Sequence, residues 1–338
     1  MGLRDLVVRA ATSRPRVLVV EMPGGAPARM AVERELDRRG WPVGTAPGSA
    51  DVLLLAGEVP EPLAEAVELL WDQLPGPRAR ACPSGPGDVA HELDAAQASL
   101  RDDLRQRADA RERDREPASS WVEDDMDHGD MDHGDMDHGD MDHGDHGDME
   151  MAPGGIPLAE GDDDRDGLEM DVLVHPLGPL LDHWPGGLEL RTRLHGDVVA
   201  EVEVHRPAAE AAEAADDVPV AAATWDAVAT VLALVGDEVW ARRARALRDQ
   251  HLGLDGAGDQ HAVRAHLARL ARTHVLPHSV ADVLGRLLDE RLDPAAHRLD
   301  DAALSSLLEG HDLGDVRLMV AAHAPLLPLG RAEEVGHD

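Results

Sequence analysis

The sequence predicts a fold of class α/β plus α, in which a small parallel-sheet domain and a β-hairpin followed by a helical bundle flank a disordered linker. Three observations support this prediction. Short β-branched runs alternate with helix-like segments near the start of the chain. Residues 126–151 repeat with a period of five, and leucine, valine and alanine recur at helical spacing after residue 207. The predicted segments are an α/β domain over residues 1–90, a charged helix over 88–116, a disordered acidic linker over 117–167, β-strands over 168–206 and a helical bundle over 207–330.

The negative charge is concentrated in the linker. The formal net charge is −35, and residues 116–166 contain nineteen Asp or Glu against one Arg. Such an acidic chain repels phosphates, so we expect no nucleic-acid partner. Cys82 is the single cysteine, which excludes an internal disulfide and a four-cysteine metal site built from this chain alone. Residues 1–16 lack the apolar core of a signal peptide, so we expect a cytoplasmic protein.

The first domain is predicted from short strands and helices that proline and glycine residues delimit. Residues 16–20 are a β-branched run between Pro15 and a Pro-Gly-Gly turn, and Pro27 can open a helix that Gly40 ends. The remaining predicted elements are a strand over residues 50–56, a helix over 60–73 and a strand over 78–82. This order predicts a small parallel sheet with helices on both faces, as in flavodoxin-like folds.

Residues 88–116 predict one long, highly charged helix. Its apolar stripe is thin and consists of Leu93, Leu100 and Leu104. We expect this helix to project from the first domain towards the linker.

Two segments of the first domain resemble a known family. Residues 48–57 read Gly-Ser-Ala-Asp-Val-Leu-Leu-Leu-Ala-Gly, and residues 71–78 read Trp-Asp-Gln-Leu-Pro-Gly-Pro-Arg. Over residues 15–90 the chain resembles the small, electron-transferring subunit shared by nickel–iron hydrogenases and respiratory NADH:quinone oxidoreductase. The resemblance implies the fold of that subunit and a place in an oxidoreductase complex.

The cluster cysteines of that family are missing. The turn after the first strand reads Glu-Met-Pro-Gly-Gly at residues 21–25, and Cys82 lies before the position where the resemblance implies the next ligand. We therefore expect the fold without its iron–sulfur cluster. We interpret Cys82 as a buried small hydrophobic residue, because nothing nearby in the sequence would make it a thiolate.

The linker offers a set of soft and intermediate metal ligands. Four copies of Met-Asp-His-Gly-Asp span residues 126–145, and a period of five forms neither a helical nor a strand face. The candidate ligands are His128, His133, His138, His143 and His146 with Met126, Met131, Met136, Met141, Met149 and Met151. Imidazole and thioether groups suit copper or nickel, and the tract resembles metal-binding tracts of bacterial copper-resistance proteins. The alternative is an acidic tether whose Met and His side chains are unused.

The second folded part begins with strands. In residues 168–174 and 188–204, apolar and polar residues alternate as in a β-strand, and residues 194–198 predict a hairpin turn. The sequence His-Pro-Leu-Gly-Pro at residues 175–179, together with this hairpin, resembles the start of the large subunit of the same enzymes. The predicted helices that follow cover residues 221–235, 238–251, 260–274, 279–291 and 300–309.

The bundle carries no recognisable catalytic pattern. The two Cys-x-x-Cys pairs of the hydrogenase metal centre are absent, and the chain has no tyrosine to hold a quinone. We interpret the scattered histidines as surface or structural residues: His251, His261, His266, His274, His278, His297, His311 and His323. The most apolar window, residues 218–235, contains Asp226 and predicts a buried helix rather than a membrane span.

Two functional hypotheses follow. The first is a non-catalytic or accessory subunit of a hydrogenase-like or NADH:quinone-oxidoreductase-like complex that has lost its iron–sulfur and nickel sites. Its partners would be the other subunits of a membrane-associated redox complex, at the inner face of the cell membrane. The second is a cytoplasmic protein that buffers or delivers copper or nickel through the linker. An independent enzyme ranks last, because the folded parts contain no nucleophile–base pair or nucleotide fingerprint.

Overall fold

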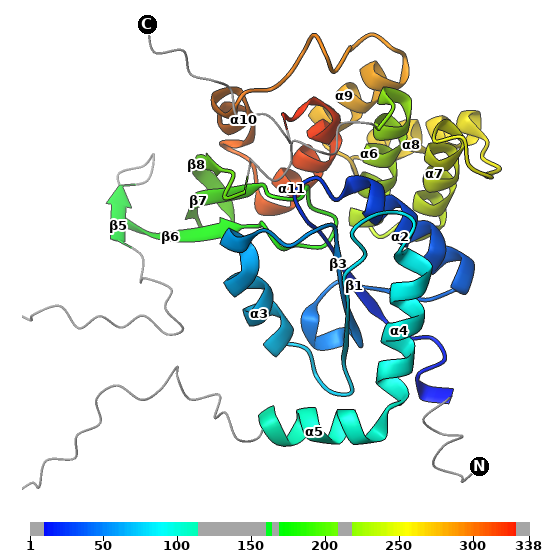
Figure 1. The fold of residues 1–338 in the computed structure, drawn as a ribbon. Helices are drawn as coiled ribbons and strands as arrows, with labels where there is room; N and C mark the ends of the chain where they lie inside the picture. The colour runs from blue at the N-terminus through cyan, green and yellow to red at the C-terminus, as the bar shows by residue number, and fades with distance from the viewer. Residues whose placement is uncertain (1–9, 114–159, 164–168, 209–217, 329–338) are drawn as a thin grey trace, which may run out of the picture.

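The first half is built around a parallel sheet. The computed structural model describes residues 10–113, 160–163, 169–208 and 218–328 (Figure 1). The sheet has the order β2-β1-β3-β4, and β1 pairs in parallel with both β2 and β3. Its strands are β1 (Val17–Glu21), β2 (Val43–Gly44), β3 (Val52–Ala56) and β4 (Ala79–Ala81). The three predicted strands are confirmed, and β2, only two residues long, was missed.

Helices cover both faces of this sheet, as predicted (Figure 1). They are α2 (Ala26–Arg39), α3 (Ala64–Asp72) and α4 (Val89–Arg101), with the short 3-10 turns η1 (Pro47–Ser49) and η2 (Glu61–Leu63). Val17 and Val19 point to the side of α2 and α4, whereas Leu18 and Val20 point to the side of α3. This alternation is the period-two pattern of a strand that is buried on both faces.

The charged segment after the sheet differs from the prediction. The single helix over residues 88–116 is wrong, because α4 ends at Arg101 and a second helix, α5 (Asp103–Arg113), starts after an extended Asp102. The Asp102 carboxylate accepts hydrogen bonds from the backbone N–H groups of Leu104 and Arg105, as a helix N-cap does. Leu104 is 80% exposed, so it does not belong to the stripe that packs α4 on the sheet.

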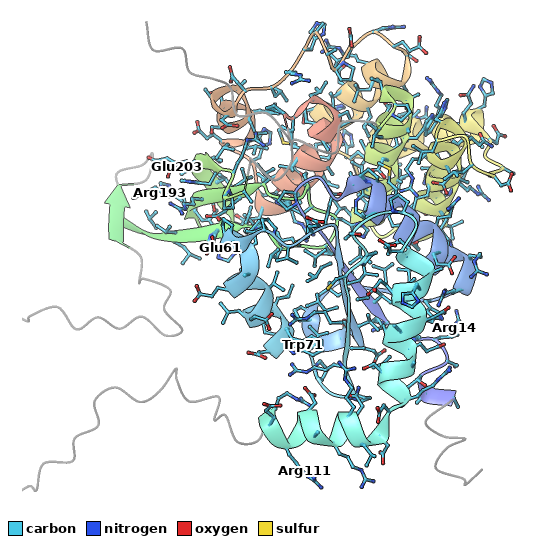
Figure 2. All side chains as sticks on the ribbon, viewed as in Figure 1. Arg14, Glu61, Trp71, Arg111, Arg193 and Glu203 are labelled. Carbon is cyan, nitrogen blue, oxygen red and sulfur yellow. The ribbon has the colours of Figure 1, made fainter. Side chains whose placement is uncertain are left out.

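Two arginines at the edge of the sheet contact α3, and one of them also pairs with α5. Trp71, labelled in Figure 2, lies 4.2 Å from the Arg78 guanidinium and 4.8 Å from that of Arg80. Arg78 is buried, and its Nη2 lies 3.1 Å from the Asp109 carboxylate on α5. The ion pair therefore holds α5 to the residue that precedes β4, so this helix does not project freely.

The second half starts with an antiparallel sheet of order β5-β6-β7-β8. Its strands are β5 (Glu160–Asp163), β6 (Glu169–Leu177), β7 (Glu189–His195) and β8 (Val198–His205). The predicted hairpin is confirmed, with Gly196 at φ 65° in its turn. The strand β5 lies inside the range predicted as linker, and residues 117–159 and 164–167 of that range lie outside the part that the structure describes.

The helices that follow pack on the hairpin as a bundle. They are α6 (Val220–Leu234), α7 (Glu238–His251), α8 (Gln260–Arg272), α9 (His278–Leu288), α10 (Asp301–Leu308) and α11 (Leu313–His323), with the 3-10 turn η6 (Ala324–Leu326). The five predicted helices are confirmed within a few residues, and α11 was missed. One apolar core joins Leu190 and Val199 of the hairpin to Val228 and Leu232 of α6. None of the helices in the described ranges is long and apolar enough to cross a membrane.

Candidate functional site at the junction of the two halves

The two halves meet at the turn between β1 and α2. The backbone N–H of Gly186 donates a hydrogen bond of 3.1 Å to Oε1 of Glu21, the last residue of β1. A Cβ on Gly186 would lie only 2.2 Å from the carbonyl oxygen of Met22, so glycine is required at this contact. The preceding Trp184 donates its indole N–H to the carbonyl of Leu188, which folds residues 184–188 into a compact loop.

This loop lies on the part of the sheet where ligands usually bind. In open parallel sheets, ligands bind outside the carboxyl ends of the strands, where the strand order reverses. Here that point lies between β1 and β3, because β1 leads to β2 on one side and β3 leads to β4 on the other. The turn after β1 closes against β3, and Met22 N donates to Ala56 O at 2.9 Å. Backbone from both halves therefore occupies the crevice.

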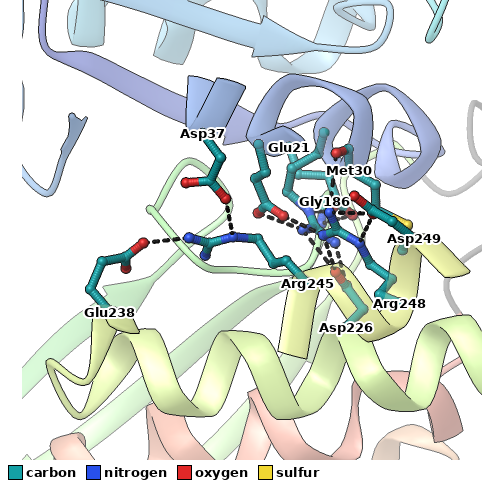
Figure 3. Close-up of polar contacts among 11 residues, drawn as sticks. Glu21, Met30, Asp37, Gly186, Asp226, Glu238, Arg245, Arg248 and Asp249 are labelled. Atoms are coloured by element: carbon teal, nitrogen blue, oxygen red, sulfur yellow. Dashed lines mark hydrogen bonds and ion pairs between the residues drawn. The ribbon is translucent and has the colours of Figure 1, made fainter. Parts of the chain in front are cut away.

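Beside the loop, a group of charged side chains, most of them buried, joins α2 to helices α6 and α7 (Figure 3). We call it the junction cluster. Its members are the guanidinium groups of Arg29, Arg245 and Arg248 and the carboxylates of Glu21, Glu33, Asp37, Asp226, Glu238 and Asp249. The Asp37 and Glu238 side chains are 33% and 52% exposed, so solvent screens their charges. The three guanidinium groups and the four other carboxylates leave a formal surplus of one negative charge.

The ion pairs cross the junction in both directions. Arg29 of α2 reaches Asp226 of α6, with 2.5 Å between Nη2 and Oδ2. Arg248 of α7 reaches back to Glu33 of α2 and also lies 2.9 Å from Asp226. The Arg248 side chain is 0% exposed, and its Nη2 donates to the carbonyl oxygen of Met30 at 3.2 Å. Buried guanidinium groups require such complete pairing, because an unpaired buried charge is costly.

The two central glutamates respond differently to burial. Burial by itself raises the pKa of Glu33, but the charges of Arg29, Arg248 and Arg245 outweigh this effect and hold that pKa far below its ordinary value. Burial also raises the pKa of Glu21, and there the single guanidinium of Arg29 does not compensate. Glu33 is therefore a firmly ionised partner, whereas Glu21 is the more easily protonated member.

A cavity of about 120 Å³ opens beside the cluster. Its walls come from the end of β1, the start of α2, the loop before Leu188, and helices α6 and α11. His183 lines it with a backbone φ of 53°, and its ring makes no hydrogen bond to the residues that the structure describes. Burial lowers the pKa of this imidazole, so the ring is neutral near pH 7. A non-glycine residue held at positive φ is uncommon and marks a constrained position.

The predicted metal ligands cannot be compared with this site, because His128 to His146 and Met126 to Met151 lie outside the described residues. The prediction for Cys82 is wrong: the residue is exposed, just after β4. Partial burial of its sulfur still raises the thiol pKa, with Arg80 opposing. The thiol is therefore not activated as a thiolate.

Several of the scattered histidines have structural partners. His266 Nε2 lies 2.6 Å from Asp237 Oδ2, and its ring stacks on Trp240 at 4.2 Å. His323 is buried, with Nδ1 2.7 Å from the carbonyl oxygen of Met319. His274 and His278 stand edge to face at 5.7 Å. Within residues 10–113, 160–163, 169–208 and 218–328, no three His, Cys, Asp or Glu side chains gather as metal ligands would.

Sequence reasoning missed the junction cluster, although one signal was present. Asp226 interrupts the most apolar window of the chain, and a carboxylate there needs a buried partner. The spacing of Arg29 to Glu33 and of Arg245 to Arg248 puts each pair on one helix face.

Neither a scan against protein-family models nor a search of curated proteins found a match to this chain.

Proposed function

We propose that the chain is a non-catalytic or accessory subunit of a hydrogenase-like or NADH:quinone-oxidoreductase-like complex. Its first half would correspond to the small subunit and its second half to the start of the large subunit, fused in that order. The proposal rests on the two sequence resemblances and is supported by the way in which the halves pack. Its partners would be cysteine-complete subunits of a membrane-associated complex, at the cytoplasmic face of the membrane.

The observation that carries the non-catalytic part of the proposal is the packing of Gly186 on Met22. The resemblance implies an iron–sulfur cluster beside the turn after β1, and the residues present do not fit one. The turn offers Glu21, Met22 and Pro23 in place of thiolates, and the backbone of Gly186 packs directly on the Met22 carbonyl. One cysteine in the whole chain cannot supply the four thiolates that such a cluster needs. No redox step is therefore assigned to this chain.

The first test is isolation of the full-length tagged chain from cells that make it, at its natural level. We expect it to purify in a fixed ratio with cysteine-complete small and large subunits. The isolated chain, made under anaerobic and cluster-sufficient conditions, should contain neither iron nor acid-labile sulfide. Cys82→Ser is the matched control and should change neither result, because the Cys82 thiol holds no cluster. Stoichiometric iron and sulfide on the isolated chain, or a chain that associates with no such subunits, would contradict the proposal.

The alternative proposal is a protein that buffers or delivers copper or nickel. The observation that favours it is the repeat of residues 126–151, with one imidazole and one thioether in each five-residue unit. Calorimetric titration with Cu(I), Cu(II) and Ni(II) should then show binding that a variant lacking residues 126–151 loses. Equal copper binding by both proteins would leave the repeat as a tether.

A further inference from the structure

The cavity at the junction has the size of a single small ring. Its volume of about 120 Å³ is somewhat below that of an apolar cavity of roughly 150 Å³ that accommodates benzene. Met30, Trp184, Ala227 and Pro325 supply apolar wall. These side chains favour a compact hydrocarbon body, of one ring or a short aliphatic chain.

The polar wall offers acceptors but few donors. Glu21, Arg29 and Asp226 line it together with His183. The Arg29 N–H groups already bond Glu21, Glu33 and Asp226. A carboxylate has about four lone-pair sites, and among the residues that the structure describes the Glu21 carboxylate accepts only from Arg29 and from the N–H of Gly186. The Glu21 carboxylate can therefore accept further hydrogen bonds from a ligand that brings its own donors.

The charge balance points the same way. Two carboxylates and one guanidinium border the cavity, and the shielded groups of the junction cluster carry a formal surplus of one negative charge. Because carboxylates outnumber guanidinium groups on this wall, a cation gains attraction and an anion meets repulsion. A ligand that only accepts hydrogen bonds meets a guanidinium that three carboxylates already engage.

We infer that this cavity binds a small organic cation, a protonated primary amine carried on a ring-sized or short aliphatic group. The ammonium group donates to Glu21 and Asp226, and the hydrocarbon body packs against Met30 and Trp184. Amine binding in the cavity goes beyond the proposed accessory role and does not depend on it. Copurification and iron content test the accessory role separately.

Three probes of nearly equal size test the inference on the full-length protein: benzylamine, benzyl alcohol and benzoate. Titrations are followed by calorimetry at pH 7 in 0.3 M salt, which screens binding to the exposed acidic surface. Benzylamine should bind saturably with a dissociation constant on the order of 1 mM. It should bind about ten-fold more tightly than benzyl alcohol, because its hydrogen bonds are charge-assisted, and benzoate should not bind.

A cavity-filling variant identifies the site. Ala223 lies on α6 and lines the cavity, so Ala223→Leu should abolish benzylamine binding. Ala221→Leu places the same group on the exposed face of the same helix and should bind like the natural protein. Should Ala223→Leu fail to fold, Thr230→Leu fills the cavity from the next turns of α6. The inference is overturned by absence of benzylamine binding, by equal or tighter binding of the alcohol or benzoate, or by amine binding that persists in a folded cavity-filling variant.

Discussion

The parallel sheet and the junction both contain fully buried side chains but differ in what they bury. Val52 and Leu54 in the sheet and Arg248 at the junction are all 0% exposed. The sheet interior is aliphatic, and each fully buried Val or Leu there contributes roughly 1.5–3 kcal/mol to the free energy of folding. This hydrophobic contribution does not depend on a specific orientation of the contacting groups. The junction is ionic, and desolvation of its charges offsets much of their attraction. This difference separates two tasks: apolar burial stabilises each half, and the junction cluster fixes how the halves meet.

The largest effect should come from removing Arg248. Arg248→Met leaves Glu33, Asp226 and Asp249 buried with too little positive charge, and we expect a loss of about 3–5 kcal/mol in the free energy of unfolding. Urea denaturation measures it. Arg242→Met changes an exposed position on the same helix and should cost no more than about 0.5 kcal/mol. If the two variants were equally stable, the cluster would not matter to folding.

A smaller loss is expected where the loop meets the β1–α2 turn. In Gly186→Ala the new Cβ collides with the Met22 carbonyl, which must move, at a cost of about 1–3 kcal/mol. Gly48→Ala is the matched control, since a Cβ there meets no atom within 4 Å. Thermal unfolding of both variants should separate them clearly. An unchanged midpoint for Gly186→Ala would mean that the halves do not touch there.

The sheet could be predicted from the sequence because its signals are local. Pro27 and Gly40 lie within one residue of the ends of α2, and the β-branched run before them is β1. The junction could not be predicted in this way. Its partners are far apart, with Arg29 197 residues from Asp226 and Glu33 215 residues from Arg248. Charges on a helix face usually indicate solvent exposure, so only the position of Asp226 within an apolar window gave any warning.

Some elements were missed or misplaced for other physical reasons. The strand β2 is too short to form a pattern of its own. The helix α11 is buried on most sides, with Val316, Met319 and Ala322 all in the core, so it lacks the polar face that marks a surface helix. The break at Asp102 follows from an N-cap side chain within a segment that otherwise favours a helix.

The pH dependence should distinguish the two glutamates of the junction. The folded-state pKa of Glu33 is depressed, so ionised Glu33 contributes its full share to the free energy of unfolding above the unfolded-state pKa, and this share is lost as pH falls. The loss of unfolding free energy caused by Glu33→Gln should therefore be smaller at pH 4 than at pH 7. The folded-state pKa of Glu21 is raised, so its ionisation disfavours the folded state as pH rises. Glu21→Gln should therefore become more stable relative to the natural protein as pH rises from 4 to 7, whereas Glu33→Gln should become less stable relative to it. Urea unfolding across this range measures both differences. If both differences changed in the same direction with pH, the opposite pKa shifts given to the two glutamates would be contradicted.

The most direct measurement is a double-mutant cycle between Arg248 on α7 and Glu33 on α2, using Arg248→Met, Glu33→Gln and the double variant. The two residues belong to different halves of the chain and pair only if the halves pack as described. Unfolding free energies of the four proteins at pH 7 should give a coupling energy of about 1–3 kcal/mol. A coupling energy below about 0.5 kcal/mol, the additivity expected of independent sites, would contradict the account.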